Sequence, residues 1–147
     1  MRWVVRHSGT LLALYLVLLA VALFYPSSQE QSNAVVWLGE LLRVLGAPSR
    51  LTSFNRLEVV MNALIVAPAT FLASMVVPRF GWRDWTCFGF VAALTVEAAQ
   101  GLLLPGRQAS FSDVVANTAG ALIGSAVFAG IRYLAGSRSM LRTGRPD

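Results

Sequence analysis

The sequence is poor in charged residues, which make up only 13% of its 147 residues. A soluble domain normally carries about a quarter charged residues. Hydrophobic residues reach 56%, and the mean hydropathy is +0.62. The scarcity of charge excludes an ordinary soluble domain and predicts an integral membrane protein. The length corresponds to one domain, with room for about four membrane spans.

Cysteine and histidine are scarcer still. Cys87 is the single cysteine and His7 the single histidine, so an intrachain disulfide is excluded. Cys87 lies in an apolar stretch with no histidine nearby, which leaves a metal or redox role without support. We therefore expect no cofactor and no metal site, and we interpret Cys87 as a small buried hydrophobic residue.

Lysine is absent, and all 12 basic residues are arginine, with a net charge of +5 and a pI of about 10.7. The arginines separate the apolar segments and do not form one basic stripe, which argues against a nucleic-acid partner. With the N-terminus inside the cell, the cytoplasmic side carries eight arginines: Arg2, Arg6, Arg79, Arg83, Arg132, Arg138, Arg142 and Arg145. The outer side carries four: Arg43, Arg50, Arg56 and Arg107. The positive-inside rule then predicts a multi-pass protein of the plasma membrane with both termini in the cytoplasm.

Four apolar segments are long enough to cross a bilayer. They predict spans at about residues 9–25, 57–77, 85–104 and 111–134. The first could be a signal peptide, but bulky Phe24 and Tyr25 occupy the expected cleavage site, so we interpret it as a retained span.

The connection between the first two spans is the longest polar one. Residues 27–33 are predicted to be an exposed linker, and residues 35–45 a short amphipathic helix that lies on the membrane surface. The tail from Gly136 is predicted to be disordered. The predicted fold is an all-α membrane protein in which residues 1–147 form a single domain. It has four transmembrane helices and a short extracytoplasmic interfacial helix between the first two.

Polar residues recur at helical spacing inside three of the four spans. Such residues are expensive in lipid and usually face a protein interior or a water-filled cavity. Each pair, three or four residues apart, shares one helix face, and the predicted orientation brings all pairs to the outer side. We expect one ligand-binding site formed by these residues and by the arginine of the last turn: Glu58, Asn62, Glu97, Gln100, Arg107, Asp113 and Asn117.

Several of these residues also have structural interpretations. Glu97 is either a titrating or ligand-binding carboxylate or a structural partner of Arg107 or Gln100. Asp113 stands at a helix start and suits an N-terminal cap equally well.

Three further residues are interpreted through helix packing. Gly120 and Gly124 form a Gly-xxx-Gly pattern that permits close helix approach. Pro68 has no N–H to donate to the carbonyl of Leu64 and predicts a kink in the second span.

The C-terminal half of the sequence resembles the VanZ-like family. The resemblance rests on Glu97-xx-Gln100, the Leu104-Pro-Gly-Arg107 turn, Ser112-Asp113-xxx-Asn117 and the glycines Gly120 and Gly124. Asn62 to Pro68 is similar to an earlier family element, although Val66 and Thr70 stand where the family usually has Phe and Gly. The resemblance covers about residues 55–130. It implies a small bacterial membrane protein of a family associated with low-level resistance to teicoplanin, a lipid-tailed glycopeptide.

Two classes of function follow from the residues. One is a non-enzymatic binding or transport-like protein that exchanges a proton or holds an amphiphilic cell-envelope ligand, either a membrane lipid or a lipid-linked cell-wall precursor. The other is a membrane-embedded hydrolase or transferase acting on such a precursor, with Glu97 and Asp113 as acid and base. The sequence has no recognisable nucleophile motif, so binding is favoured. The glycine face and the alanine-rich helices also allow a homo-oligomer.

Overall fold

The computed structural model describes residues 2–24, 28–104 and 110–143. These residues form five helices and no strand: α1 (Arg2–Phe24), α2 (Ser28–Val44), α3 (Phe54–Val76), α4 (Trp82–Leu103) and α5 (Phe111–Thr143). The all-α fold predicted from the sequence is confirmed.

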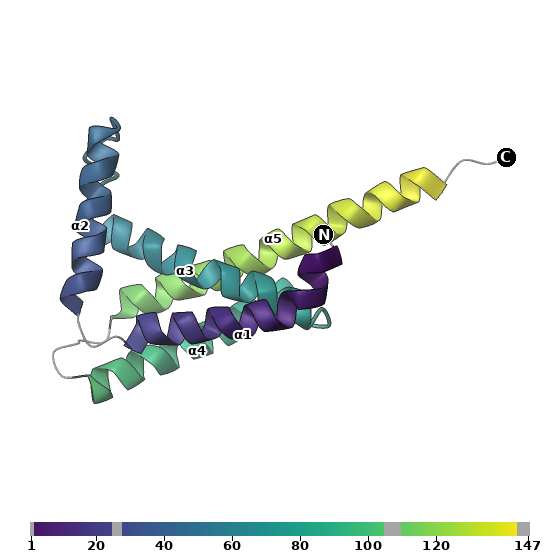
Figure 1. Cartoon of the computed structure of the whole chain (residues 1–147), viewed down its shortest axis with the longest axis horizontal. Coiled ribbons are helices and arrows are strands. Elements are labelled where there is room, and N and C mark those ends of the chain that lie inside the picture. Colours follow the sequence, from purple (N-terminus) through teal and green to yellow (C-terminus); the bar gives the residue numbers. More distant parts are fainter. Residues whose placement is uncertain (1, 25–27, 105–109, 144–147) are drawn as a thin grey trace.

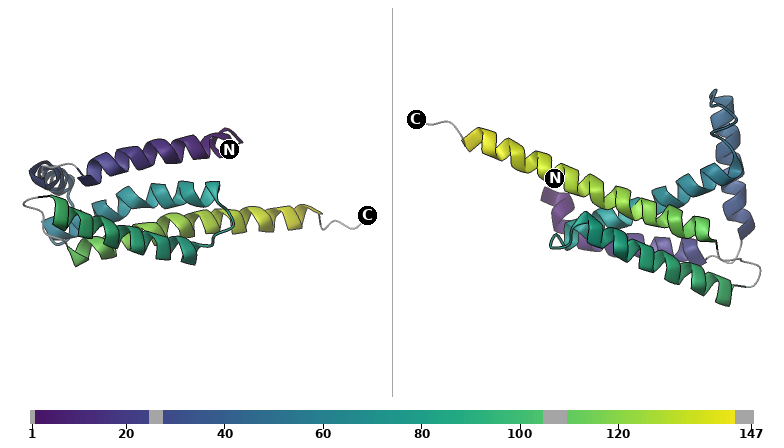
Figure 2. Two further views of the ribbon diagram at one scale, coloured as in Figure 1. Left: turned by 90° about the horizontal axis from the view of Figure 1, so that it is seen from below. Right: turned by 180° about the vertical axis from the view of Figure 1, so that it is seen from behind.

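Four of the helices run side by side with alternating direction, and α2 lies across one end of them (Figure 1). α1 lies on one side of the group formed by α3, α4 and α5, next to α3 (Figure 2). We call the end that carries α2 the α2 end. The opposite end, which holds the α3–α4 turn at residues 77–81, is called the turn end. An even number of spans brings the start of α1 and the C-terminal part of α5 to the same end of the bundle.

The four bundle helices are long and apolar enough to cross a membrane. Their candidate spans are His7–Phe24, Phe54–Val76, Trp82–Leu103 and Phe111–Ser137. The shortest has 18 residues, which at 1.5 Å per residue is about 27 Å, close to the thickness of the hydrocarbon core. Only 6% of the α1 span is buried inside the molecule, against 39% of the α5 span. α5 is therefore the packing centre, and most of α1 offers its apolar side chains to the surroundings.

The contact between α3 and α5 depends on the absence of side chains at two positions. A Cβ at Gly120 would collide with the carbonyl oxygen of Ala63, and one at Gly124 with the carbonyl oxygen of Ala67. The two helix backbones touch directly along this line, as small-xxx-small patterns permit.

Small polar side chains are buried here without cost because they bond to their own helix. The hydroxyl of Ser74 donates to the carbonyl of Thr70 at 2.7 Å, and that of Ser125 donates to the carbonyl of Ala121 at the same distance. Both serines are almost completely buried. Polar groups that find a local acceptor remain compatible with an apolar core.

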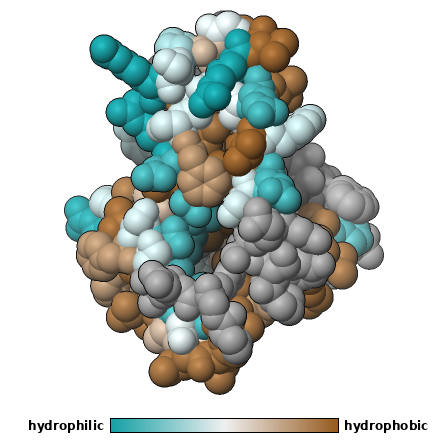
Figure 3. Space-filling view, turned by 90° about the vertical axis from the view of Figure 1, so that its left-hand side faces the viewer, coloured by the Kyte–Doolittle hydropathy of each residue, from teal (hydrophilic) through white to brown (hydrophobic). Residues whose placement is uncertain are grey.

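α2 is longer than the sequence predicts, because residues 28–33 are helical and do not form a linker. Its end agrees with the prediction, since Gly46 adopts a φ of +88°, a conformation that favours glycine. Arg43 fixes this end through a 2.9 Å hydrogen bond from Nε to the hydroxyl of Thr52. Trp37 is 65% exposed. Figure 3 looks onto this end and shows hydrophilic and hydrophobic residues mixed over the α2 side, as expected for a helix at a membrane surface.

Two further expectations are wrong. α5 continues to Thr143, so residues 136–143 are helical where the sequence predicted disorder. These residues are mostly small or polar, which is also typical of coil, but they continue the helix of the preceding span. Cys87 is exposed, because it lies on a face of α4 that is turned away from the other helices. Hydropathy identifies a span but does not say which face of it packs inward.

Candidate functional site

The polar pairs of three helices gather at the α2 end. α3 and α5 start at this end and α4 finishes there, so the early residues of two helices meet the late residues of the third. We call the described members of this group the polar cluster: Glu58, Asn62, Glu97, Gln100, Asp113 and Asn117. Glu97, Gln100 and Asn117 are each only 6% exposed, which places them inside the helix group and not on its outer surface.

A side-chain hydrogen bond joins α3 and α5 across the cluster. Nδ2 of Asn62 donates to Oδ1 of Asp113 at 2.9 Å. Glu58 lies one turn before Asn62, close enough to Asp113 for the two carboxylates to repel each other when both are charged. The amide of Asn62 therefore supplies a donor where two acids approach.

Glu97 reaches from α4 to the start of α5. Its Oε2 accepts a 2.8 Å hydrogen bond from the backbone N–H of Ser110, the residue that precedes α5. The first N–H groups of a helix have no partner within it, and a carboxylate there is also favoured by the helix dipole. Glu97 thus fixes where the α4–α5 connection ends. Sequence reasoning missed this partner, because every residue except proline has a backbone N–H and the pattern of side chains does not single one out.

Gln100 connects α4 to α1. Its Nε2 donates to the carbonyl of Leu23 at 2.5 Å. Leu23 is in the last turn of α1, where carbonyl groups lack helical donors. The amide thereby secures the helix that has the least burial of its own.

Asn117 is the member of the cluster whose side-chain oxygen makes no hydrogen bond within the described chain. This oxygen, Oδ1, is buried. An unpaired buried acceptor costs about 1–3 kcal/mol. Native structures retain such a group mainly where something else supplies the donor, for example a water or a ligand.

Two residues named from the sequence stand apart from this geometry. Arg107 lies outside the described residues, so its position relative to the cluster is not given. Pro68 is exposed inside α3, which continues through it unbroken. Near this proline the structure adds a contact that sequence reasoning missed: the hydroxyl of Tyr15 in α1 donates to the carbonyl of Ile65 at 2.7 Å. A lone hydroxyl within an apolar span was the available signal.

The cluster is chemically a set of hydrogen-bond acceptors. It combines three carboxyl groups with amide oxygens, which suit hydroxyl, amide or ammonium donors. Within the described ranges, no group of three His, Cys, Asp or Glu side chains is arranged to hold a metal ion. Proton exchange and ligand binding are the chemistries that these residues can perform unaided.

Comparison with known proteins places the chain in a family. No curated protein and no solved structure matches it. A family model described as VanZ/LLP1 matches residues 12–133, which extends the resemblance back from residue 55 into α1. The match covers more than half of the sequence and contains the whole polar cluster, so the chain belongs to the VanZ family.

Proposed function

We propose that the polar cluster binds the polar headgroup of an amphiphilic cell-envelope molecule, either a membrane lipid or a lipid-linked cell-wall precursor. The observation that carries the proposal is the buried, unpaired Oδ1 of Asn117, which lies at the end of the bundle that also carries three carboxyl groups. Sugar hydroxyls, amides and amines of envelope molecules supply the donors that this acceptor set needs. The apolar helix surfaces provide the neighbouring environment for acyl or isoprenoid chains.

The contacts of the acids support binding over catalysis. Glu97 already holds the N–H of Ser110, and Asp113 already holds the amide of Asn62. A general acid or base must reach the proton that it transfers in a substrate. Both carboxylates therefore have a structural role in the folded protein, which favours a part in forming a binding site over a part in proton transfer.

The setting of this function is also proposed. The arginine distribution favours a plasma-membrane protein with the α2 end outside and both termini in the cytoplasm. In that orientation the cluster faces the leaflet that meets cell-wall precursors. Family membership extends the proposal to teicoplanin, whose lipid tail and wall-precursor target belong to the same compartment.

The experiment is native mass spectrometry of the protein purified from bacterial membranes in a mild detergent. Glu97→Gln is the informative variant because the glutamine oxygen still accepts from Ser110 while the charge is lost. Thr95→Val on α4 is the matched control, because the exposed Thr95 hydroxyl bonds only to its own helix at Val91. We expect a lipid or precursor adduct on the wild type and the control, and its loss from Glu97→Gln.

Two outcomes contradict the proposal. Equal adduct occupancy in all three proteins removes the cluster from binding, as does a wild type without any adduct. Turnover of a purified lipid-linked precursor, abolished by Glu97→Gln and by Asp113→Asn, would instead establish the hydrolase or transferase alternative.

For the antibiotic, a susceptible bacterium expressing the wild type should tolerate more teicoplanin than one expressing Glu97→Gln.

A further inference from the structure

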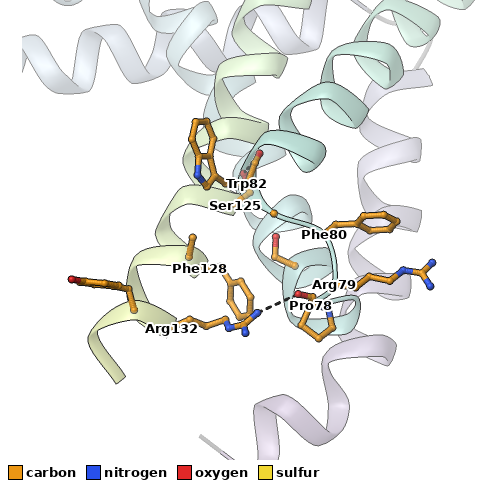
Figure 4. Close-up of a pocket in the computed structure, with 11 residues that line it drawn as sticks. Pro78, Arg79, Phe80, Trp82, Ser125, Phe128 and Arg132 are labelled. Atoms are coloured by element: carbon orange, nitrogen blue, oxygen red, sulfur yellow. Dashed lines mark hydrogen bonds between the residues drawn. The ribbon is translucent and has the colours of Figure 1, made fainter. Parts of the chain in front are cut away.

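A cavity of about 430 Å³ lies at the turn end, far from the polar cluster. It is an open pocket between the α3–α4 turn and α5, and its lining includes Pro78, Phe80, Trp82, Ser125, Phe128 and Arg132 (Figure 4). From the sequence, the arginines of this end were used only to predict the orientation of the protein in the membrane. Their arrangement around a cavity was not visible from spacing.

Arg132 is the cation of this cavity. It reaches from α5 across Phe128 toward Pro78 (Figure 4). Nη1 donates to the carbonyl of Pro78 at 3.2 Å, and the guanidinium lies 5.8 Å from the centre of the Phe128 ring. These two contacts orient a planar group that has five N–H donors. Its other N–H groups have no hydrogen-bond partner within the described chain, and Arg132 is one of the residues that line the cavity.

Two further arginines raise the positive potential around the cavity. The guanidinium of Arg79 lies 4.8 Å from the centre of the Phe80 ring, and that of Arg83 lies 5.1 Å from the Trp82 ring. Figure 4 shows Arg79 pointing away from Arg132. Arg79 therefore adds to the positive potential around the cavity but does not bind the same group as Arg132. Among the residues that the structure describes, none of those lining the cavity is acidic. The nearby Asp84 is engaged by the N–H of Gly81 at 2.8 Å, in the cap of α4.

We propose that this cavity binds the phosphate of an anionic phospholipid headgroup, with Arg132 as the residue that contacts it. A guanidinium matches two phosphate oxygens in one plane, which a lone ammonium cannot do. The surroundings select a lipid over a soluble phosphate. The cavity opens where apolar spans end, beside Trp82 and the 75% exposed Tyr133, and such aromatic residues mark the headgroup level of a bilayer. Basic pockets between membrane helices are established sites for acidic headgroups.

The test compares lipid retention by delipidated protein mixed with phosphatidylglycerol or with phosphatidylcholine, read by native mass spectrometry. Arg132→Gln removes the contact, and Ala129→Leu fills the cavity without changing charge, because Ala129 is in its lining. Arg50→Gln is the control, an exposed arginine between α2 and α3 at the other end. A thermal melt of each variant confirms that it is folded.

We expect the wild type to retain phosphatidylglycerol preferentially and Arg132→Gln to bind it about tenfold more weakly. Ala129→Leu should also lose it, whereas Arg50→Gln should stay within about twofold of the wild type. Equal losses in Arg132→Gln and Arg50→Gln, with none in Ala129→Leu, would reduce the effect to diffuse surface charge and overturn the proposal. Full displacement of the lipid by millimolar glycerol 3-phosphate would do the same, since it would make the soluble phosphate the ligand.

Discussion

The two ends of the bundle use polar residues in opposite ways. At the α2 end, acids and amides are partly or fully buried and bond between elements: Asn62 of α3 to Asp113 of α5, and Glu97 of α4 to Ser110 just before α5. At the turn end, the arginines stay at the surface and lie over the aromatic rings of their own neighbourhood. Charge therefore organises the helices at one end, and at the other it is left available to the surroundings. We expect substitutions at the two ends to affect stability and binding in different proportions.

The contrast between the two ends depends on a fixed separation of α3 and α5, and Gly120 and Gly124 are the residues at which the two backbones touch. Gly120→Leu places a side chain against the backbone of Ala63, which cannot move aside as a flexible side chain would. We expect the largest effect here, a destabilisation of at least about 2 kcal/mol or failure to fold.

Gly130→Leu is the matched control for this change. Gly130 lies on the same helix with open space around its Cα. Thermal unfolding in detergent measures both variants, and equal stability of the two would show that the α3–α5 contact is looser than described.

The bond between Asn62 and Asp113 tests whether the α2 end is organised by pairing. Asn62→Ala removes the amide that donates to Asp113, and we expect the free energy of unfolding to fall by about 1–3 kcal/mol. Asp113→Ala should cost a similar amount, and the double variant should cost less than the sum, because the same bond is lost only once. Chemical denaturation of the four proteins measures the coupling. Strictly additive losses would show that the pair does not act as a unit.

Asn117 separates function from stability at the same end. Asn117→Leu is close in volume and removes the unpaired oxygen, so the protein should become more stable by about 1 kcal/mol while losing its adduct. Thermal midpoint and adduct occupancy are measured on the same sample. A lower midpoint would show that the amide is satisfied in the folded protein and serves packing.

Arg132 should give the smallest stability effect and the clearest loss of binding at the turn end. Arg132→Gln removes an exposed contact to the carbonyl of Pro78, so its thermal midpoint in detergent should stay within about 2 °C of the wild type. Added phosphatidylglycerol should raise the midpoint of the wild type and not that of the variant. A large drop without lipid would place Arg132 among the residues that hold the fold, and the contrast between the two ends would weaken.

Much of the fold could be predicted from sequence, because a segment that crosses a lipid bilayer must be apolar and long enough to span it. Apolar length identified the spans, and the structure has four helices that meet the length and composition of membrane spans. The polar pairs were recognised because polar side chains at helical spacing are rare in such segments. Residues 28–33 and 136–143 were assigned wrongly, because small and polar residues are compatible with both helix and coil. Both segments are helical because each is continuous with a longer helix, α2 or α5.

The partners of the site residues could not be predicted in the same way. Spacing on one helix says which side chains share a face, but it does not fix the rotation or depth of that helix against another. The bonds of Gln100 to Leu23 and of Glu97 to Ser110 both end on backbone atoms, which leave no mark in the sequence. The exposure of Cys87 was missed for the same reason.

The sequence by itself determined the number of long apolar helices, their alternation, and the end of the bundle to which each polar pair belongs. These properties depend on hydropathy and helical rise, which are local. Only the tertiary structure decided that Asp113 meets Asn62, that Asn117 keeps an unpaired oxygen and that Arg132 faces a cavity. Those results depend on how closely α3 and α5 approach at Gly120 and Gly124, and backbone contact between distant segments is a property of the packed chain.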